Sequence, residues 1–259
     1  KPTISQLRRL ARVFHFPIAV FYLPAPPPLK TIHPKDRRFL PAFERTVLSP
    51  ELNYEFRRVV ERREITLELL ANLGTLPKRF EVTTTLRVPP EILGREIRDS
   101  LNATIDEQSS WRDVRVAFNS WRQKLESLNI LVFQTADVPL SQMRGFALYY
   151  GVLPIISVNR KDSYAARIFT LMHELVHLML RMESLCDIAE ESNYHSKDDL
   201  SIEVFCNSVA ACTLVPRDAL LSDENLQCAQ DLTTDGEMAL KKMSRRFSVS
   251  REVIVRRML

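Results

Sequence analysis

Apolar residues recur at every third or fourth position over most of this chain, a spacing that predicts helices with one buried face. Near the N-terminus this pattern predicts a helix over residues 3–14 and a short one over 17–23. At Ser49-Pro50-Glu51 an N-capping serine precedes a proline and an acid, which predicts a helix, or a bent pair of helices, from there to about Gly74. The same periodicity predicts further helices that begin near Pro89 and Ser110 or span about 163–181, 199–214, 233–247 and 250–259.

A different pattern, short runs of β-branched and aromatic residues, occupies the middle of the chain. Residues 130–133, 146–150 and 154–158 are predicted strands, and the last two form a predicted hairpin that turns near Gly151. The chain is therefore predicted to have an α+β fold that is mainly helical and contains a small antiparallel sheet.

Composition places the chain among soluble globular proteins. Of its 259 residues, 45% are hydrophobic and 26% are charged, which is ordinary for such proteins. No apolar run approaches the roughly 20 residues of a membrane span, and the opening Lys1-Pro2-Thr3 is unlike a secretion signal. The four cysteines include no C-x-x-C pair. Reduced thiols, a cytoplasmic location and no membrane partner are expected.

Proline and basic residues mark the N-terminal region as distinct. Residues 24–28 read Pro-Ala-Pro-Pro-Pro, a run that favours extended chain, so residues 24–48 are predicted to be a linker. The net charge of +4 is too small to indicate nucleic-acid binding, but residues 1–48 hold nine basic residues and only two acidic ones. This asymmetry fits a phosphate-facing surface and a solvated helix face equally well.

The strongest chemical signal is His173-Glu174-Leu175-Val176-His177, an H-E-x-x-H motif within the predicted helix 163–181. Residues four apart lie one turn apart on the same helix face, so the two imidazoles can bind one Zn²⁺. Glu174 is placed to take a proton from an attacking water. The alternative is a chance match, because only three positions of the motif are fixed. In its apolar helical setting the motif favours a zinc hydrolase, and a peptidase above all.

A catalytic zinc needs a third protein ligand and an open position. Residues 178–184 lack the H-x-x-G-x-x-H continuation of the metzincins. Glu203, in the next predicted helix, is the best candidate, because a carboxylate among apolar neighbours is costly to bury without a cation. A surface acid is the alternative for Glu203. Asn207, one turn further on the same face, is either a partner to a ligand or a helix-packing amide.

Three further residues are weaker candidates. Tyr194 and His195 lie in the polar loop between the two helices, where either can reach over a metal to polarise a carbonyl or stabilise an oxyanion. Cys186 is either a small buried hydrophobe or a soft fourth ligand that takes the water position in a resting state.

The H-E-x-x-H helix, the segment Glu203-x-x-x-Asn207-x-x-Ala210 and the following Leu214-Val215-Pro216 together resemble the ImmA/IrrE family of zinc metallopeptidases. The resemblance covers about 110–259, because residues 143–148, 154–159, 185–187 and 246–257 are also similar to segments of that family. It implies a zincin-like fold, in which the small sheet packs on the H-E-x-x-H helix. It also implies one catalytic Zn²⁺ with His173, His177 and Glu203 as ligands. Glu174 is then the catalytic acid and base.

The family resemblance further implies a function. Such a protein is a cytoplasmic bacterial or phage endopeptidase that cleaves a helix-turn-helix transcriptional repressor, and so releases genes for stress response, mobile-element transfer or defence. Two other roles use the same motifs. One is an Xre-fused transcriptional regulator or sensor with a structural or regulatory zinc site, and the other is the toxin of a toxin–antitoxin pair.

Residues 1–23 resemble the tail of an Xre-type helix-turn-helix domain. The recognition helix of such a domain would precede Lys1, so DNA binding is not expected of this chain, and whether a longer parent protein binds DNA is left open. The expected division is thus a helix-turn-helix remnant over 1–23, a Pro-rich basic linker over 24–48 and a peptidase domain over 49–259. Within that domain, leading helices span 49–128 and the catalytic core spans 129–259.

Substrate docking can also be predicted from the hairpin of residues 146–159. An exposed edge strand there would let an extended peptide segment pair with the sheet. A flexible linker in a repressor is then a better target than a folded domain.

Overall fold

The computed structural model describes residues 2–14, 16–25, 49–181, 184–186, 197–229 and 234–259. Nearly all of the predicted linker lies outside these residues. None of the described helices is both long and apolar enough to cross a membrane. The elements are α1 (Ile4–Phe14), the 3-10 helix η1 (Ile18–Tyr22), α2 (Pro50–Asn72), α3 (Pro90–Ser100), α4 (Ile105–Ser110), α5 (Val114–Ser127), β1 (Leu131–Thr135), β2 (Gly145–Leu148), β3 (Ile155–Asn159), α6 (Tyr164–Met179), β4 (Ser184–Cys186), α7 (Lys197–Leu214), α8 (Arg217–Leu221), α9 (Leu226–Ala229), α10 (Thr234–Phe247) and α11 (Arg251–Met258).

Helix starts follow the capping residues in the sequence. Ser49 caps α2 as predicted, because its Oγ accepts a hydrogen bond from the backbone N of Leu52 at 3.2 Å. The helix predicted from about Ser110 is in fact two helices. α4 ends at Ser110, and α5 begins after Asp113, whose Oδ1 accepts hydrogen bonds from two backbone amides at 2.9 Å. A new N-cap therefore divides one periodic pattern into two elements.

Four strands form a mixed sheet in the order β1-β3-β2-β4. The predicted hairpin is present, since β2 and β3 are antiparallel, and β4 is antiparallel to β2. The expectation of a wholly antiparallel sheet is wrong for β1 and β3, which run parallel with Leu131 opposite Ile155. The chain reverses direction twice between β1 and β3, and the hairpin folds back so that β3 lies beside β1.

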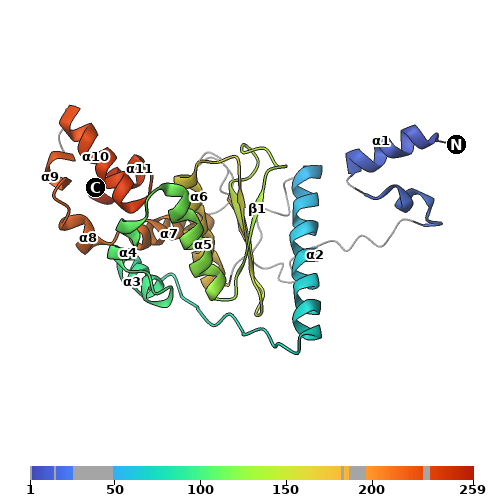
Figure 1. The fold of residues 1–259 in the computed structure, drawn as a ribbon, viewed down its shortest axis with the longest axis horizontal. Coiled ribbons are helices and arrows are strands. Elements are labelled where there is room, and N and C mark those ends of the chain that lie inside the picture. The colour runs from blue at the N-terminus through green and yellow to red at the C-terminus, as the bar shows by residue number, and fades with distance from the viewer. Residues whose placement is uncertain (1, 15, 26–48, 182–183, 187–196, 230–233) are drawn as a thin grey trace.

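The sheet lies between two layers of helices, with α2 on one face and α5 and α6 on the other (Figure 1). Side chains on one face, such as Phe146 and Ile155, pack with α2. Those on the other face, such as Ala147 and Ile156, join a larger core formed with α3, α5, α6, α7, α10 and α11. Because both faces are covered, β2 and β3 are buried throughout. The α+β, mainly helical fold with a sheet packed on the H-E-x-x-H helix is confirmed.

Glu55 of α2 is a carboxyl group that is fully buried against the sheet. Its Oε2 lies 3.3 Å from Nε of Arg58. Burial raises the pKa of Glu55 above its ordinary value of 4.5 and outweighs the opposing effects of Arg58 and of a hydrogen bond with Thr135. In the pH interval between the ordinary and the raised pKa of Glu55, the folded chain therefore binds its proton more strongly than the unfolded chain does.

A Glu55→Gln variant is expected to gain stability relative to the unmodified protein as the pH rises above about 4.5. Between the ordinary and the raised pKa, the folded state binds more protons than the unfolded state, so the stability of the unmodified protein falls with pH by at most about 1.4 kcal/mol per unit. The glutamine does not titrate. Urea unfolding over a pH series measures the difference, with Glu61→Gln, an exposed acid of the same helix, as the control. A difference that is the same at every pH would contradict the raised pKa.

Candidate metal centre

α6 carries the H-E-x-x-H motif through the interior of the molecule. The helix begins where Oγ of Ser163 accepts a hydrogen bond from the backbone N of Ala166 at 3.2 Å. It packs against β2, β3, α5 and α7, and every residue from Thr170 to Met179 is buried. Polar side chains on this helix therefore lie in a medium where each needs a compensating partner.

The side chains of His173, His177 and Glu203 meet between α6 and α7. The Nε2 atoms of the two histidines lie 3.0 Å apart. Oε2 of Glu203 lies 3.2 Å from Nε2 of His173, and Oε1 lies 3.3 Å from Nε2 of His177. Both histidine side chains are almost fully buried, whereas that of Glu203 is 25% exposed. The three residues form a group that could hold a metal ion and that reaches solvent on the Glu203 side.

The spacing and chemistry of this group fit zinc. Tetrahedral zinc with bonds of about 2.0–2.2 Å holds its ligand atoms about 3.3–3.6 Å apart, a little more than the distances of 3.0, 3.2 and 3.3 Å between these atoms. Two imidazole nitrogens and one carboxylate oxygen are also a known ligand set of catalytic zinc.

The charges of the group are strongly coupled. Burial disfavours protonation of His173, but the hydrogen bond and charge of Glu203, with the charge of Glu174, outweigh burial and raise the pKa of His173. Burial opposes ionisation of Glu203, yet its hydrogen bonds with His173 and His177 hold the pKa of Glu203 well below its usual range. Glu203 is thus a carboxylate at physiological pH, the form that binds a metal.

Asn207 of α7 contacts the outer side of the group. Nδ1 of His173 lies 2.9 Å from Oδ1 of Asn207. With its proton on Nδ1, the imidazole donates to the amide oxygen and directs the lone pair of Nε2 toward His177 and Glu203. The amide thus contacts a candidate ligand, which favours the interpretation of Asn207 as a partner to a ligand over that of a helix-packing amide.

Glu174 lies where β2 crosses close to α6. Its side chain is fully buried. A Cβ atom at Gly145 of β2 would collide with Cγ2 of Thr170 and lie 3.4 Å from Oε1 of Glu174. The collision with Thr170 shows that a glycine at this position lets β2 pass close to α6, beside the Glu174 carboxylate. Sequence reasoning misses this role of Gly145, although a glycine at the start of a strand often marks a close approach.

The family model of the IrrE N-terminal-like domain (Peptidase_M78) matches residues 125–259, a segment that holds the whole sheet, α6 and α7. The chain belongs to this family. A search of curated proteins finds no match. The resemblance of the core to ImmA/IrrE proteins is confirmed, whereas the helix-turn-helix resemblance of residues 1–23 lies outside the matched segment. Membership supports a metallopeptidase activity with a protein substrate.

The side chains of three predicted site residues of this IrrE-like chain are not among those that the structure describes. Tyr194 and His195 lie in the undescribed segment 187–196. The backbone of Cys186 belongs to β4 and pairs with Gly145, but its side chain is not among those described. The roles of these three residues stay predictions.

The prediction that a strand of the hairpin lies at the edge of the sheet is wrong for this IrrE-like fold. β2 pairs with both β3 and β4, and β3 pairs with both β1 and β2, so both hairpin strands are interior. The described sheet ends in β1 on one side and in β4 on the other. Because Cys186 of β4 is opposite Gly145, β4 is the outer strand on the side of Glu174.

Proposed function

We propose that this protein is a zinc-dependent endopeptidase that cleaves a helix-turn-helix transcriptional repressor. The observation that carries the proposal is the convergence of His173, His177 and Glu203, with Glu174 one residue from the first histidine. Membership in a peptidase family supports the reaction class.

Zinc would be held by these three side chains, and when bound it supplies a Lewis acid that polarises the scissile carbonyl and makes water a better nucleophile at neutral pH. Asn207 orients the ring of His173 through the 2.9 Å contact with Nδ1. The low pKa of Glu203 keeps its carboxylate ionised.

Glu174 is the proposed acid and base. It takes a proton from water while the water oxygen adds to the carbonyl carbon of the peptide. It then gives that proton to the amine nitrogen as the C–N bond breaks, so the carboxylate is regenerated. Its carboxylate is fully buried beside β2, which limits its contact with bulk water.

The outer edge of β4 is the proposed docking site for substrate. A peptide that pairs with β4 adds a strand to the sheet, and the pairing of Cys186 with Gly145 places this edge on the side of Glu174. Only an extended segment can pair in this way, which favours the linker of a repressor over a folded domain. A repressor target also places the reaction in the cytoplasm.

The N-terminal division is part of the same proposal. α1 and η1 are two short consecutive helical elements, as expected for the end of a helix-turn-helix domain. Residues 24–48 then join this remnant to the peptidase domain, whose leading helices precede the matched segment.

Co-expression with a helix-turn-helix repressor, chosen from among the products of neighbouring genes, tests the substrate. Mass spectrometry is expected to find two repressor fragments with the unmodified chain and intact repressor with a catalytically inactive variant. An intact repressor in both cases, with cleavage of a peptide library retained, would reject the repressor and keep the peptidase. Cleavage of another protein together with growth arrest would favour a toxin. No cleavage of any peptide would favour a zinc-containing sensor.

A further inference from the structure

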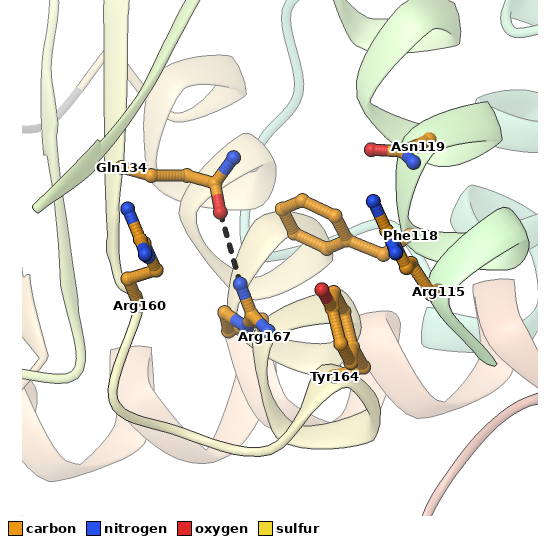
Figure 2. Close-up of a pocket in the computed structure, with 7 residues that line it drawn as sticks. All are labelled: Arg115, Phe118, Asn119, Gln134, Arg160, Tyr164 and Arg167. Carbon is orange, nitrogen blue, oxygen red and sulfur yellow. Dashed lines mark hydrogen bonds between the residues drawn. The ribbon is translucent and has the colours of Figure 1, made fainter.

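A cavity of about 400 Å³ lies at the N-terminal end of α6, beside α5 and β1 (Figure 2). Three arginines line it, Arg115 from α5, Arg160 from the turn before α6 and Arg167 from α6 itself. No acidic side chain lines the cavity among the described residues. The remaining polar side chains in its wall are Asn119, Gln134 and Tyr164.

Arg167 is a cation built into the wall of this cavity, and only 5% of its surface is exposed. Its Nη1 donates to Oε1 of Gln134 at 2.9 Å, and its guanidinium lies 3.9 Å from the ring centre of Tyr164 and 5.0 Å from that of Phe118. Its Nε has no hydrogen-bond acceptor among the described residues. A buried guanidinium that meets only a neutral amide and aromatic rings is costly, and an anion in the cavity would offset that cost.

The acids nearest in sequence to the cavity residues are engaged elsewhere. Asp113 caps α5 and contacts Arg112 at 3.5 Å. Asp162 pairs with Arg144 at 3.3 Å, and the first turn of α6 contains no acid. The positive charges around the cavity are therefore not neutralised by these two carboxylates.

We propose that this cavity binds the phosphate group of a small phosphorylated ligand such as a nucleotide. Planar guanidinium groups bind phosphate oxygens in pairs, and three of them can share the several oxygens of one phosphate. The volume lies in the range of small-molecule sites. A nucleic-acid strand would instead need a long basic groove with successive stacking platforms.

This site is separate from the metal centre. Arg167 precedes His173 by six residues on the same helix, which corresponds to about 9 Å along its axis. The proposal therefore stands or fails independently of peptide hydrolysis.

Calorimetric titration of the full chain with inorganic phosphate, AMP and ADP tests the proposal, with acetate as the carboxylate comparison. Saturable binding of a phosphate compound, tighter than that of acetate, is expected. Arg115→Gln and Arg160→Gln, both at exposed residues, are each expected to weaken binding by about tenfold or more, since each removes a charge-assisted contact. Arg167→Lys keeps the charge but loses the planar fork, and is also expected to weaken binding.

The matched control is Arg112→Gln, which removes the same charge from an exposed arginine that does not line the cavity. It is expected to leave the affinity unchanged. Equal affinities for phosphate and AMP would point to free phosphate, and tighter AMP binding would point to a nucleotide; both support the site. Three results would overturn it: no saturable binding, equal weakening by Arg112→Gln, or binding of a single-stranded oligonucleotide without binding of phosphate or nucleotides.

Discussion

A Glu174→Gln variant is expected to lose peptide cleavage and to keep its zinc. The amide has nearly the shape of the carboxylate but cannot accept the proton of water, and a positioned acid–base group contributes about 10²–10⁴-fold to rate. Glu174 is not among the three residues whose side chains converge, so metal content should stay at one ion per chain. Cleavage kinetics and metal analysis of the same preparation measure both quantities.

The comparison variant is Glu224→Gln, which changes an exposed acid in the same way and is expected to change neither rate nor metal content. The two rival roles give different outcomes. If zinc is structural in a sensor, Glu174→Gln should leave the biological output of the protein unchanged. If the variant loses its zinc as well as its activity, the acid–base role of Glu174 is contradicted, and the residue instead helps to hold the metal.

A Glu203→Ala variant is expected to bind zinc roughly 100-fold or more weakly. Removal of a residue that only orients a ligand costs about 10–100-fold in metal affinity, and removal of a ligand should cost more. Alanine also leaves two buried histidines without the carboxylate that contacts both of them at 3.2 and 3.3 Å. Competition with a chromogenic chelator measures the affinity.

Two other variants on α7 serve as comparisons for the zinc affinity of Glu203→Ala. Asn207→Ala is expected to fall in the 10–100-fold range, because it removes only the 2.9 Å contact with Nδ1 of His173. Val204→Ala alters the neighbouring side chain, which is 55% exposed, and is expected to have no effect. An unchanged affinity in Glu203→Ala would show that the third ligand is another residue.

Local features could be predicted from the sequence because their causes are local. The N-cap Ser49 and the strand pair around Gly151 depend on residues within a few positions of each other. The same holds for His173 and His177, whose relative placement is set by the helix period alone. Glu203 is 26 residues from His177, and it became a candidate through the cost of burying its carboxylate and through the family resemblance.

Features that depend on distant packing could not be predicted. β4 is three residues long and lies in a polar stretch, and it forms through its pairing with β2. The parallel pair of β1 and β3 depends on where the hairpin folds back. Arg167 lies on the same helix as the H-E-x-x-H motif, but the cavity that it lines requires α5 and β1 beside it.

The most direct test of the account is an anomalous diffraction measurement on crystals of the zinc-loaded full chain, above and below the zinc absorption edge. The account predicts one strong peak between α6 and α7, within bonding distance of Nε2 of His173, Nε2 of His177 and the carboxylate of Glu203. A fully loaded crystal with no peak at this position, or with its zinc held by other residues, would contradict the proposed metal centre and the reaction derived from it.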